Sequence, residues 1–342
     1  MSPFRTHTGP TPSSPIAHTF FHQPTSTWTY VVQSKQTKHA LIIDPALDFD
    51  QKTNEVSTAT ADGLLAFVRD RGLTLTHVLE THAHADHLTA SQWLKKRWRE
   101  LQAERRLEGE ENGLGEEADV DFSLASEGGA ASGAGGAGIG EGDVQVCIGE
   151  RIEQVQKLWG KRFGVPVEEL DGAFDKLWAD DEQFALGELT CQVVHLPGQL
   201  VASSQLRASP HRADLPPPPF SLPSTPDHVG YLIGDYIFCG DSLFLPDVGS
   251  ARADFPGGST SQLYASSQKL LSLPPSTRVF SGHDYPGADR DKSCSSTVAE
   301  QRAYNKHLHD GVDTDDFVKM REARDKGMRE PGLLWESLQV NM

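Results

Sequence analysis

Apolar residues recur along the chain in two patterns: short runs with β-branched and aromatic residues, and longer segments with helical spacing. The segment from Ala59 to Arg71 places Leu64, Leu65, Phe67 and Val68 on one side and ends before Gly72, which predicts a helix. The same patterns predict strands at Thr27–Gln33, His39–Asp44, Leu73–Glu80, Val144–Ile148, Leu189–His195, Val229–Ile233, Tyr236–Cys239 and Arg278–Ser281, and helices at Leu88–Arg99, Arg151–Trp159, Ser261–Leu273 and Val298–His307. Strands that alternate with helices in both halves of the chain indicate a layered α/β sandwich.

Two segments show neither pattern. Residues 1–20 begin with a stretch rich in Ser, Thr and Pro, so we expect a flexible N-terminus there. The segment Glu100–Gly142 opens with charged residues and continues in Gly, Ala, Ser and Glu. This composition cannot bury enough apolar surface to offset its ordering entropy, so a disordered surface insert is expected. The remainder, residues 21–342, is expected to form a single domain.

Composition narrows the class of protein. The net charge of -17 argues against a nucleic-acid-binding protein, which would need a basic face. No apolar run approaches the length of a membrane span, and the N-terminus lacks the apolar region of a secretory signal. The four cysteines are widely spaced, which favours reduced thiols. We therefore expect a cytoplasmic protein, with a mitochondrial location as the alternative, that acts on a small molecule.

A cluster of metal-binding residue types follows the strand that ends at Glu80. Three histidines and one aspartate lie within six residues, in Thr81-His82-Ala83-His84-Ala85-Asp86-His87. Two later strands end in Gly240-Asp241 and Gly282-His283. Imidazoles and carboxylates that converge at strand ends can bind one or two metal ions. The candidate metal ligands are His82, His84, Asp86, His87, Asp241 and His283.

This series of motifs resembles the metallo-β-lactamase superfamily, and the resemblance covers roughly Phe20 to the end of the chain. It implies an αββα sandwich of the metallo-β-lactamase kind. By position, it assigns His82, His84 and Asp241 to a first metal site, and Asp86, His87, Asp241 and His283 to a second.

Longer segments resemble persulfide dioxygenases and the related bacterial β-lactamase-like hydrolases. They are Gly240–Phe244, Gly249–Gly258, Gly282–Tyr285 and parts of the tail, including Val298–Arg302, His309–Val312 and Gln339–Asn341. The resemblance implies one Fe(II) held by His82, a later His and Asp241, with His82 and Asp241 as catalytic residues. It also implies oxidation of glutathione persulfide to sulfite and glutathione. Arg252 is a candidate for binding a carboxylate of that substrate.

The motif that carries the later His is interrupted. The family has a Pro-Gly-His-Thr-Pro turn, whereas this chain reads Pro197-Gly198-Gln199 and resumes at Thr225-Pro226. We hypothesise that Gln199–Ser224 is a translated intron, because codons CAG for Gln199 and AGC for Ser224 would leave one His codon after splicing. The proline-rich run around Pro216–Pro219 is what a pyrimidine-rich tract would encode. The chain as written would then bind metal weakly or be inactive.

Other histidines could replace the missing ligand only in special cases. A neutral amide at Gln199 is a poor substitute for imidazole at iron. His195 is expected to pack in its strand or support a ligand, and His211 or His228 could reach the metal only if the insert folds back.

Two other functions stay open. One is a di-zinc thioester hydrolase related to glyoxalase II, which would use the same residues with Zn²⁺ as the alternative metal. The other is an inactive, misspliced product.

Overall fold

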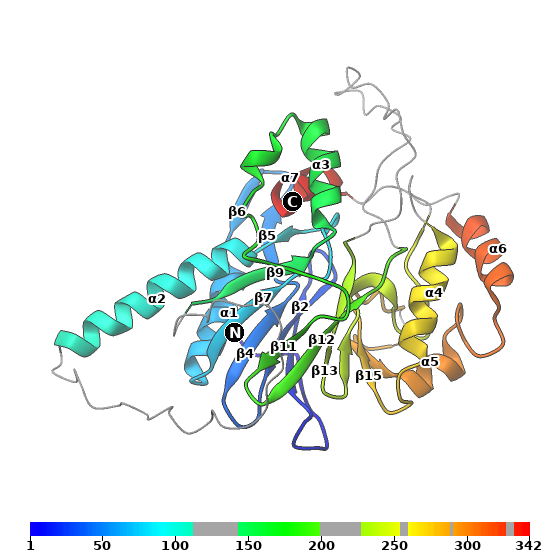
Figure 1. Ribbon diagram of the computed structural model, residues 1–342, viewed down its shortest axis with the longest axis horizontal. Helices are drawn as coiled ribbons and strands as arrows, with labels where there is room; N and C mark the ends of the chain where they lie inside the picture. Colours follow the sequence, from blue (N-terminus) through cyan, green and yellow to red (C-terminus); the bar gives the residue numbers. More distant parts are fainter. Residues whose placement is uncertain (112–142, 199–226, 254–258, 288–289, 326–331) are drawn as a thin grey trace, which may run out of the picture.

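Two mixed β-sheets face each other across a hydrophobic core in the computed structural model (Figure 1). The structure describes residues 1–111, 143–198, 227–253, 259–287, 290–325 and 332–342. The first sheet contains, in spatial order, β1 (Arg5–Thr8), β2 (Ile16–His22), β3 (Thr27–Gln33), β4 (His39–Ile43), β7 (Thr74–Leu79), β9 (Gln145–Gly149) and β10 (Lys176–Trp178). The second contains β11 (Gln183–Leu186), β12 (Leu189–His195), β13 (Val229–Ile233), β14 (Tyr236–Phe238), β15 (Arg278–Phe280) and β16 (Ser295–Thr297). A small third sheet contains β6 (Glu55–Ser57), β5 (Ala46–Asp50) and β8 (Leu88–Thr89).

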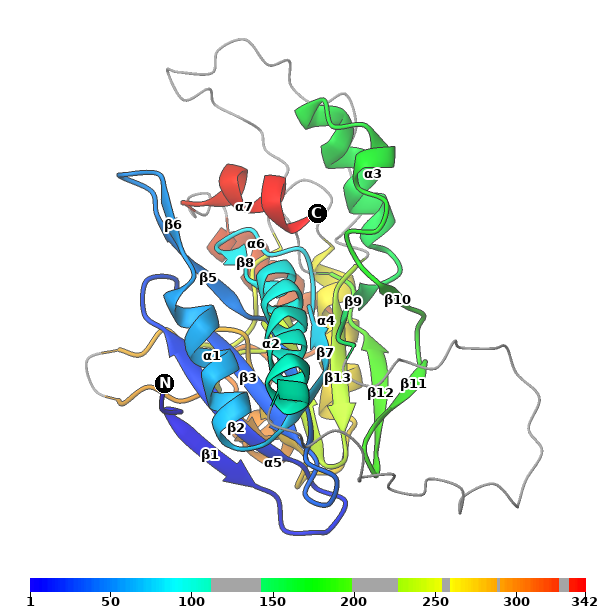
Figure 2. The same ribbon diagram turned by 90° about the vertical axis from the view of Figure 1, so that its left-hand side faces the viewer.

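Helices cover the outer face of each large sheet, which gives the αββα sandwich that the sequence predicts (Figures 1 and 2). The first sheet is covered by α1 (Ala59–Asp70) and α2 (Ser91–Glu111), and the second by α4 (Thr260–Leu271), α5 (Val298–Tyr304) and α6 (Thr314–Asp325). Two further helices, α3 (Ile152–Phe163) and α7 (Leu334–Asn341), lie at one end of the sandwich (Figure 1). Short 3₁₀ turns occur at Val167–Glu169 and at Gly240–Ser242, here called η1 and η2.

The core between the sheets is built from alternating residues of facing strands. Aromatic side chains fill its centre, among them Trp28, Tyr30, Tyr231, Phe238 and Phe280, all at most 2% exposed. The rings of Phe238 and Phe280 stack with centroids 4.8 Å apart, which joins the adjacent strands β14 and β15. This packing fixes the strand ends from which the candidate metal ligands project.

The structure places strands within residues 1–20, where we expected a flexible N-terminus. The strand β1 pairs antiparallel with β2, and Ala17 and Phe20 of β2 are buried. The sequence of this stretch does not predict its strands, because they are stabilised by the pairing of β2 with β3 and by burial, and not by an apolar periodicity of their own.

The predicted insert also begins too early. The helix predicted for Leu88–Arg99 is a short strand, β8, followed by α2, which continues to Glu111. Residues 100–111 are helical because Leu101 extends the apolar side of Leu94 and Trp98, and because Arg97 pairs with Glu100 and Glu104. The rest of the predicted insert, residues 112–142, lies outside the described residues.

The other predicted elements are present, with ends shifted by a few residues. One such shift is in α5, predicted to reach His307 but ending at Tyr304, because the Asn305 side chain caps the backbone N–H groups of His307 and Leu308. Among the described residues, no helix combines the length and apolar character needed to cross a bilayer.

Candidate metal centre

The histidine-rich loop follows β7, and its first residue is hydrogen-bonded to Asp44. Asp44 follows the neighbouring parallel strand β4. The Asp44 carboxylate accepts hydrogen bonds from the Thr81 backbone N–H at 2.8 Å and from the Thr81 hydroxyl at 2.9 Å. Because parallel strands end at the same edge of a sheet, Asp44 arrives where the loop begins. The segment Thr81–His87 is here called the metal loop.

The His84 ring is oriented by two buried carboxylates. Its Nε2 lies 3.1 Å from Asp44 Oδ1 and 3.0 Å from Glu80 Oε2, and all three side chains are at most 3% exposed. Burial acts to lower the pKa of His84, but the Asp44 and Glu80 carboxylates hold it well above its ordinary value. Because Nε2 faces the two carboxylates, Nδ1 of the same ring faces away from them.

The remaining candidate ligands converge from both sheets. Asp241 lies in η2 just after β14, and His283 follows β15; these strands are parallel neighbours, so both side chains reach the same edge. His283 Nε2 lies 3.2 Å from Asp86 Oδ2 and 3.4 Å from Asp241 Oδ1. Asp241 Oδ2 lies 3.9 Å from His82 Nε2, and Asp86 Oδ2 lies 3.2 Å from His87 Nδ1. The structure thus brings all six candidate ligands into one cluster.

Two glycines allow this close approach. A Cβ atom at Gly240 would lie 2.5 Å from Thr81 Oγ1, and one at Gly282 would lie 2.5 Å from Asp241 Oδ1. Gly240 also has a φ of +50°, which most residues avoid. The small residue before each later ligand is therefore a requirement of the site.

The protonation states of three candidate ligands suit a metal centre. Burial lowers the pKa of His82 well below its ordinary value and, with a contribution from His84, lowers that of His87 to about 4. Burial acts to raise the pKa of Asp86, but the imidazoles of His283 and His87 hold it well below its ordinary value. Two rings are therefore uncharged at neutral pH and Asp86 is ionised, the forms in which these groups bind metal.

Two buried ring nitrogen atoms of the candidate ligands have no hydrogen-bond partner in the described part of the chain. Within the described part of the chain, neither Nδ1 of His84 nor Nε2 of His87 has a hydrogen-bond partner. One ligand atom each from His84, Asp86 and His87 lie within 4.8 Å of one another. Buried polar atoms without partners are rare in folded proteins, and imidazole with carboxylate suits zinc or iron. The residues present fit a bound metal ion.

His228 lies inside the centre, which the sequence did not predict. We expected it near the metal only if the insert folded back, but β13 carries it there by pairing with β12. Its ring stacks on His82 with centroids 4.6 Å apart and planes 7° apart, and its Nε2 lies 3.1 Å from the Cys239 carbonyl oxygen. A metal ion binds in the plane of an imidazole, so two parallel stacked rings cannot share one ion. His228 therefore supports the His82 ring and does not replace the missing ligand.

The other predicted residues lie as follows. His195 pairs with Asp180 at 3.4 Å, in agreement with a role outside the ligand set. Gln199 and His211 lie outside the described residues. Arg252 is partly exposed in a loop that α6 holds in place, where Arg321 donates to the Ser250 carbonyl oxygen. The structure thus anchors the Arg252 loop without assigning the side chain a substrate.

Asp227 supports the metal loop from the second sheet. Its Oδ2 accepts a hydrogen bond from the Ala83 backbone N–H at 2.7 Å, and the residue is fully buried. Burial raises the pKa of this carboxyl to about 6. The sequence offered only a weak signal for this contact, since Asp227 lies two residues before the predicted strand Val229–Ile233.

Replacing Asp227 with asparagine should change how stability depends on pH. The folded chain holds the Asp227 proton more tightly than the unfolded chain, so the protonated carboxyl favours folding below about pH 4, and this contribution is lost as the pH rises to about 6. The unfolding free energy of the wild type minus that of Asp227→Asn should fall by about 3 kcal/mol across this range. Urea titrations of metal-free protein measure it, and parallel pH profiles would contradict the assignment.

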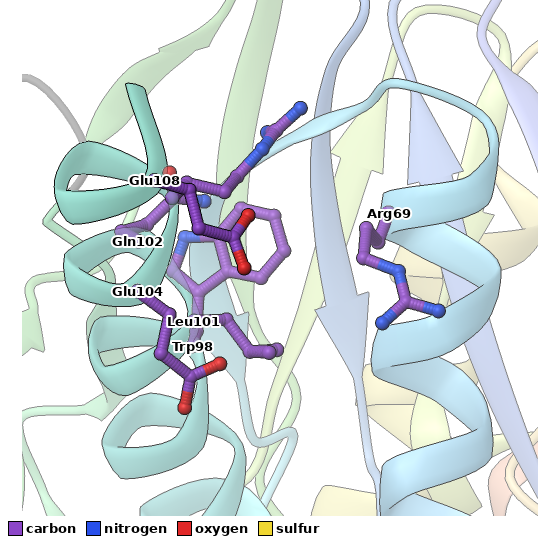
Figure 3. Close-up of a pocket in the computed structure, with 7 residues that line it drawn as sticks. Arg69, Trp98, Leu101, Gln102, Glu104 and Glu108 are labelled. Carbon is purple, nitrogen blue, oxygen red and sulfur yellow. The ribbon is translucent and has the colours of Figure 1, made fainter. Parts of the chain in front are cut away.

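A separate hollow of about 140 Å³ lies between α1 and α2 around Trp98 (Figure 3). Arg69 lines it from α1, and Glu104 and Glu108 line it from α2. Acidic and basic side chains mix at its rim, so it indicates no particular ligand. It lies on the helical side of the first sheet, and none of the candidate metal ligands lines it.

Comparisons with known proteins agree with this geometry. The model of the metallo-beta-lactamase superfamily matches residues 22–283. The beta-lactamase hydrolase-like protein of Xylella fastidiosa (strain 9a5c) is 37% identical over 96% of this chain, which spans only 60% of that protein. The mitochondrial persulfide dioxygenase ETHE1 of Homo sapiens is 25% identical over 90% of this chain and 81% of its own length. The crystal structure of ETHE1 from Myxococcus xanthus has the same fold, with a TM-score of 0.58 and 23% identity over 95% of this chain and 97% of that one. The chain belongs to the metallo-β-lactamase superfamily.

Proposed function

We propose that this chain derives from an iron-dependent persulfide dioxygenase that oxidises glutathione persulfide. In the balanced reaction, glutathione persulfide, O₂ and water give glutathione and sulfite, and two protons are released. The observation that carries the proposal is the meeting of His82 with Asp241, whose Nε2 and Oδ2 atoms lie 3.9 Å apart at the ends of strands from different sheets. The 25% identity with a persulfide dioxygenase across most of both chains supports it.

The residues have separate tasks in this proposal. His82 and Asp241 would hold the iron, together with a third imidazole that this chain lacks at Gln199. Iron held by two imidazoles and one carboxylate would supply O₂ activation for oxidation of the persulfide sulfur. Asp44 and Thr81 hold the metal loop in position, and Arg252 would pair with a carboxylate of the glutathione moiety. Both protein and substrate would be cytoplasmic or mitochondrial, and neither nucleic acid nor a membrane would take part.

A second candidate is a di-zinc thioester hydrolase. It is favoured by the second ligand set, in which Asp86 Oδ2 lies 3.2 Å from both His283 Nε2 and His87 Nδ1. Such a set would hold metal, and two metal ions there would supply activation of a water molecule for attack on a carbonyl. The similarity to a protein named as hydrolase-like supports this alternative. A third candidate, an inactive product, follows from the missing ligand at Gln199.

Metal loading and two substrates distinguish these candidates. Metal-free protein would be loaded with Fe(II) under argon or with Zn²⁺, and bound metal counted by mass spectrometry. We expect O₂ uptake with glutathione persulfide, with equimolar sulfite formation, only in the iron form. Hydrolysis of a glutathione thioester by the zinc form without O₂ uptake would favour the hydrolase, and failure to retain either metal would favour the inactive product.

A further inference from the structure

Asn341, at the end of α7, forms three hydrogen bonds to the metal loop and the strand that follows it. Its side-chain N–H₂ donates to the His84 carbonyl oxygen at 2.9 Å and to the His87 carbonyl oxygen at 2.7 Å. Its side-chain oxygen accepts from the Thr89 backbone N–H at 2.8 Å. The amide orientation is determined by these partners, since two acceptors face the nitrogen and one donor faces the oxygen. Asn341 is 4% exposed, so these bonds form in a dry environment.

Neighbouring residues place Asn341 against the loop. Met342 is 5% exposed and belongs to a hydrophobic cluster that includes Ala83 of the metal loop and Ile152 and Trp159 of α3. Both ribbon views show α7 and α3 at the same end of the sandwich (Figures 1 and 2). The end of α7 therefore packs between α3 and the metal loop.

The metal loop depends on such contacts because it is not part of a strand or helix. The carbonyl groups of His84 and His87 are bound by Asn341, not by backbone hydrogen bonds of a sheet ladder. Each of these two residues also carries a ring nitrogen atom that has no hydrogen-bond partner among the described residues. Fixing both carbonyl groups fixes the Cα positions from which the two rings project, and thus where their free nitrogen atoms point.

We propose that Asn341 is a positioning residue of the metal centre, which holds His84 and His87 in the geometry that binds metal. It would not touch the metal, the substrate or the reacting atoms. The inference requires that the centre binds a metal ion, but it does not depend on whether the reaction is a dioxygenation or a hydrolysis. It adds the end of α7 to a site otherwise built from residues that follow β7, β14 and β15.

Two substitutions and a packing control test the proposal. Asn341→Ala removes all three hydrogen bonds, whereas Asn341→Asp keeps an acceptor for Thr89 but cannot donate to the two carbonyl groups. We expect both to weaken metal binding by about 10–100-fold, the usual effect of losing a group that orients ligands. Met342→Ala should lower the melting temperature by loosening α7, and it should weaken metal binding by less than either Asn341 variant, because the Asn341 side chain and its three hydrogen-bonding groups remain. Metal affinity is measured by competition with a chelator, well below the melting temperature of each metal-free variant.

The results separate a positioning role from a merely structural one. Wild-type affinity in folded Asn341→Asp would overturn the proposal, as would an equal loss in Met342→Ala. Wild-type protein that takes up no Zn²⁺ or Fe(II) would also overturn it. A second measurement needs no variant: since coupling between binding and a conformational contact is reciprocal, adding Zn²⁺ to the wild type should slow hydrogen exchange at the Thr89 amide. Unchanged exchange there, with Zn²⁺ bound, would contradict the proposal.

Discussion

Replacing Asp241 with alanine should lower metal affinity by more than about 100-fold and abolish catalysis that depends on the metal. Groups that only orient ligands are worth about 10–100-fold, and Asp241 faces the ligands directly. Its Oδ2 lies 3.9 Å from His82 Nε2 and its Oδ1 lies 3.4 Å from His283 Nε2, so one carboxylate joins the two predicted sets of ligands. Bound metal counted after dialysis against a weak chelator measures the effect.

The control for this experiment is Asp70→Ala. Asp70 is an exposed carboxylate at the end of α1 and pairs only with the adjacent Arg69 among the interactions described for it. We expect the control to keep the metal content and activity of the wild type. Full metal content in Asp241→Ala would show that the centre is assembled without this carboxylate, and the assignment of Asp241 as a ligand would be withdrawn.

The fold and the cluster of ligands were predictable from sequence because their signals are local. Each candidate ligand lies in the segment that follows a strand identified by its own apolar residues, and parallel neighbours such as β14 and β15 must end at the same edge. Gly240 and Gly282 stand directly before Asp241 and His283, and at each the neighbouring atoms leave no room for a side chain. The αββα arrangement followed from the alternation of strands and helices together with the resemblance.

The contacts that hold the centre were not predictable, because their partners are distant in the sequence. Asn341 reaches carbonyl groups more than 250 residues away, and no periodicity marks the asparagine for this role. His228 was missed because its place follows from the pairing of β12 with β13 and not from the residues around it. The order of the N-terminus, with Ala17 and Phe20 buried, comes likewise from pairing with later strands.

The second large effect concerns the missing imidazole. Replacing Gln199–Ser224 with a single histidine should tighten metal binding by at least about 10-fold, because it supplies the third ligand that iron in such a site requires. If the proposed function is correct, O₂ uptake with glutathione persulfide should increase with the tighter binding. The genomic sequence gives an independent check, since a codon other than CAG for Gln199 excludes the splice scheme.

The structure explains why the shortened chain should still fold. The strands β12 and β13 pair antiparallel with His195 opposite Val229, and the Leu196 N–H donates to the His228 carbonyl oxygen at 3.0 Å. The chain thus leaves and re-enters the described structure at paired strand ends, and one histidine with Thr225 and Pro226 can join Gly198 to Asp227 in a short connection.

A matched control separates the new ligand from the shorter loop. The same replacement with a single glutamine gives an identical chain length and differs only in the side chain next to Gly198. We expect the histidine form alone to bind Fe(II) tightly, with the glutamine form close to the original chain. If both forms gain metal affinity equally, the benefit comes from closing the loop, and the third ligand must be sought elsewhere in the centre. If neither gains, the present ligands already suffice, and the interrupted motif is not what limits metal binding.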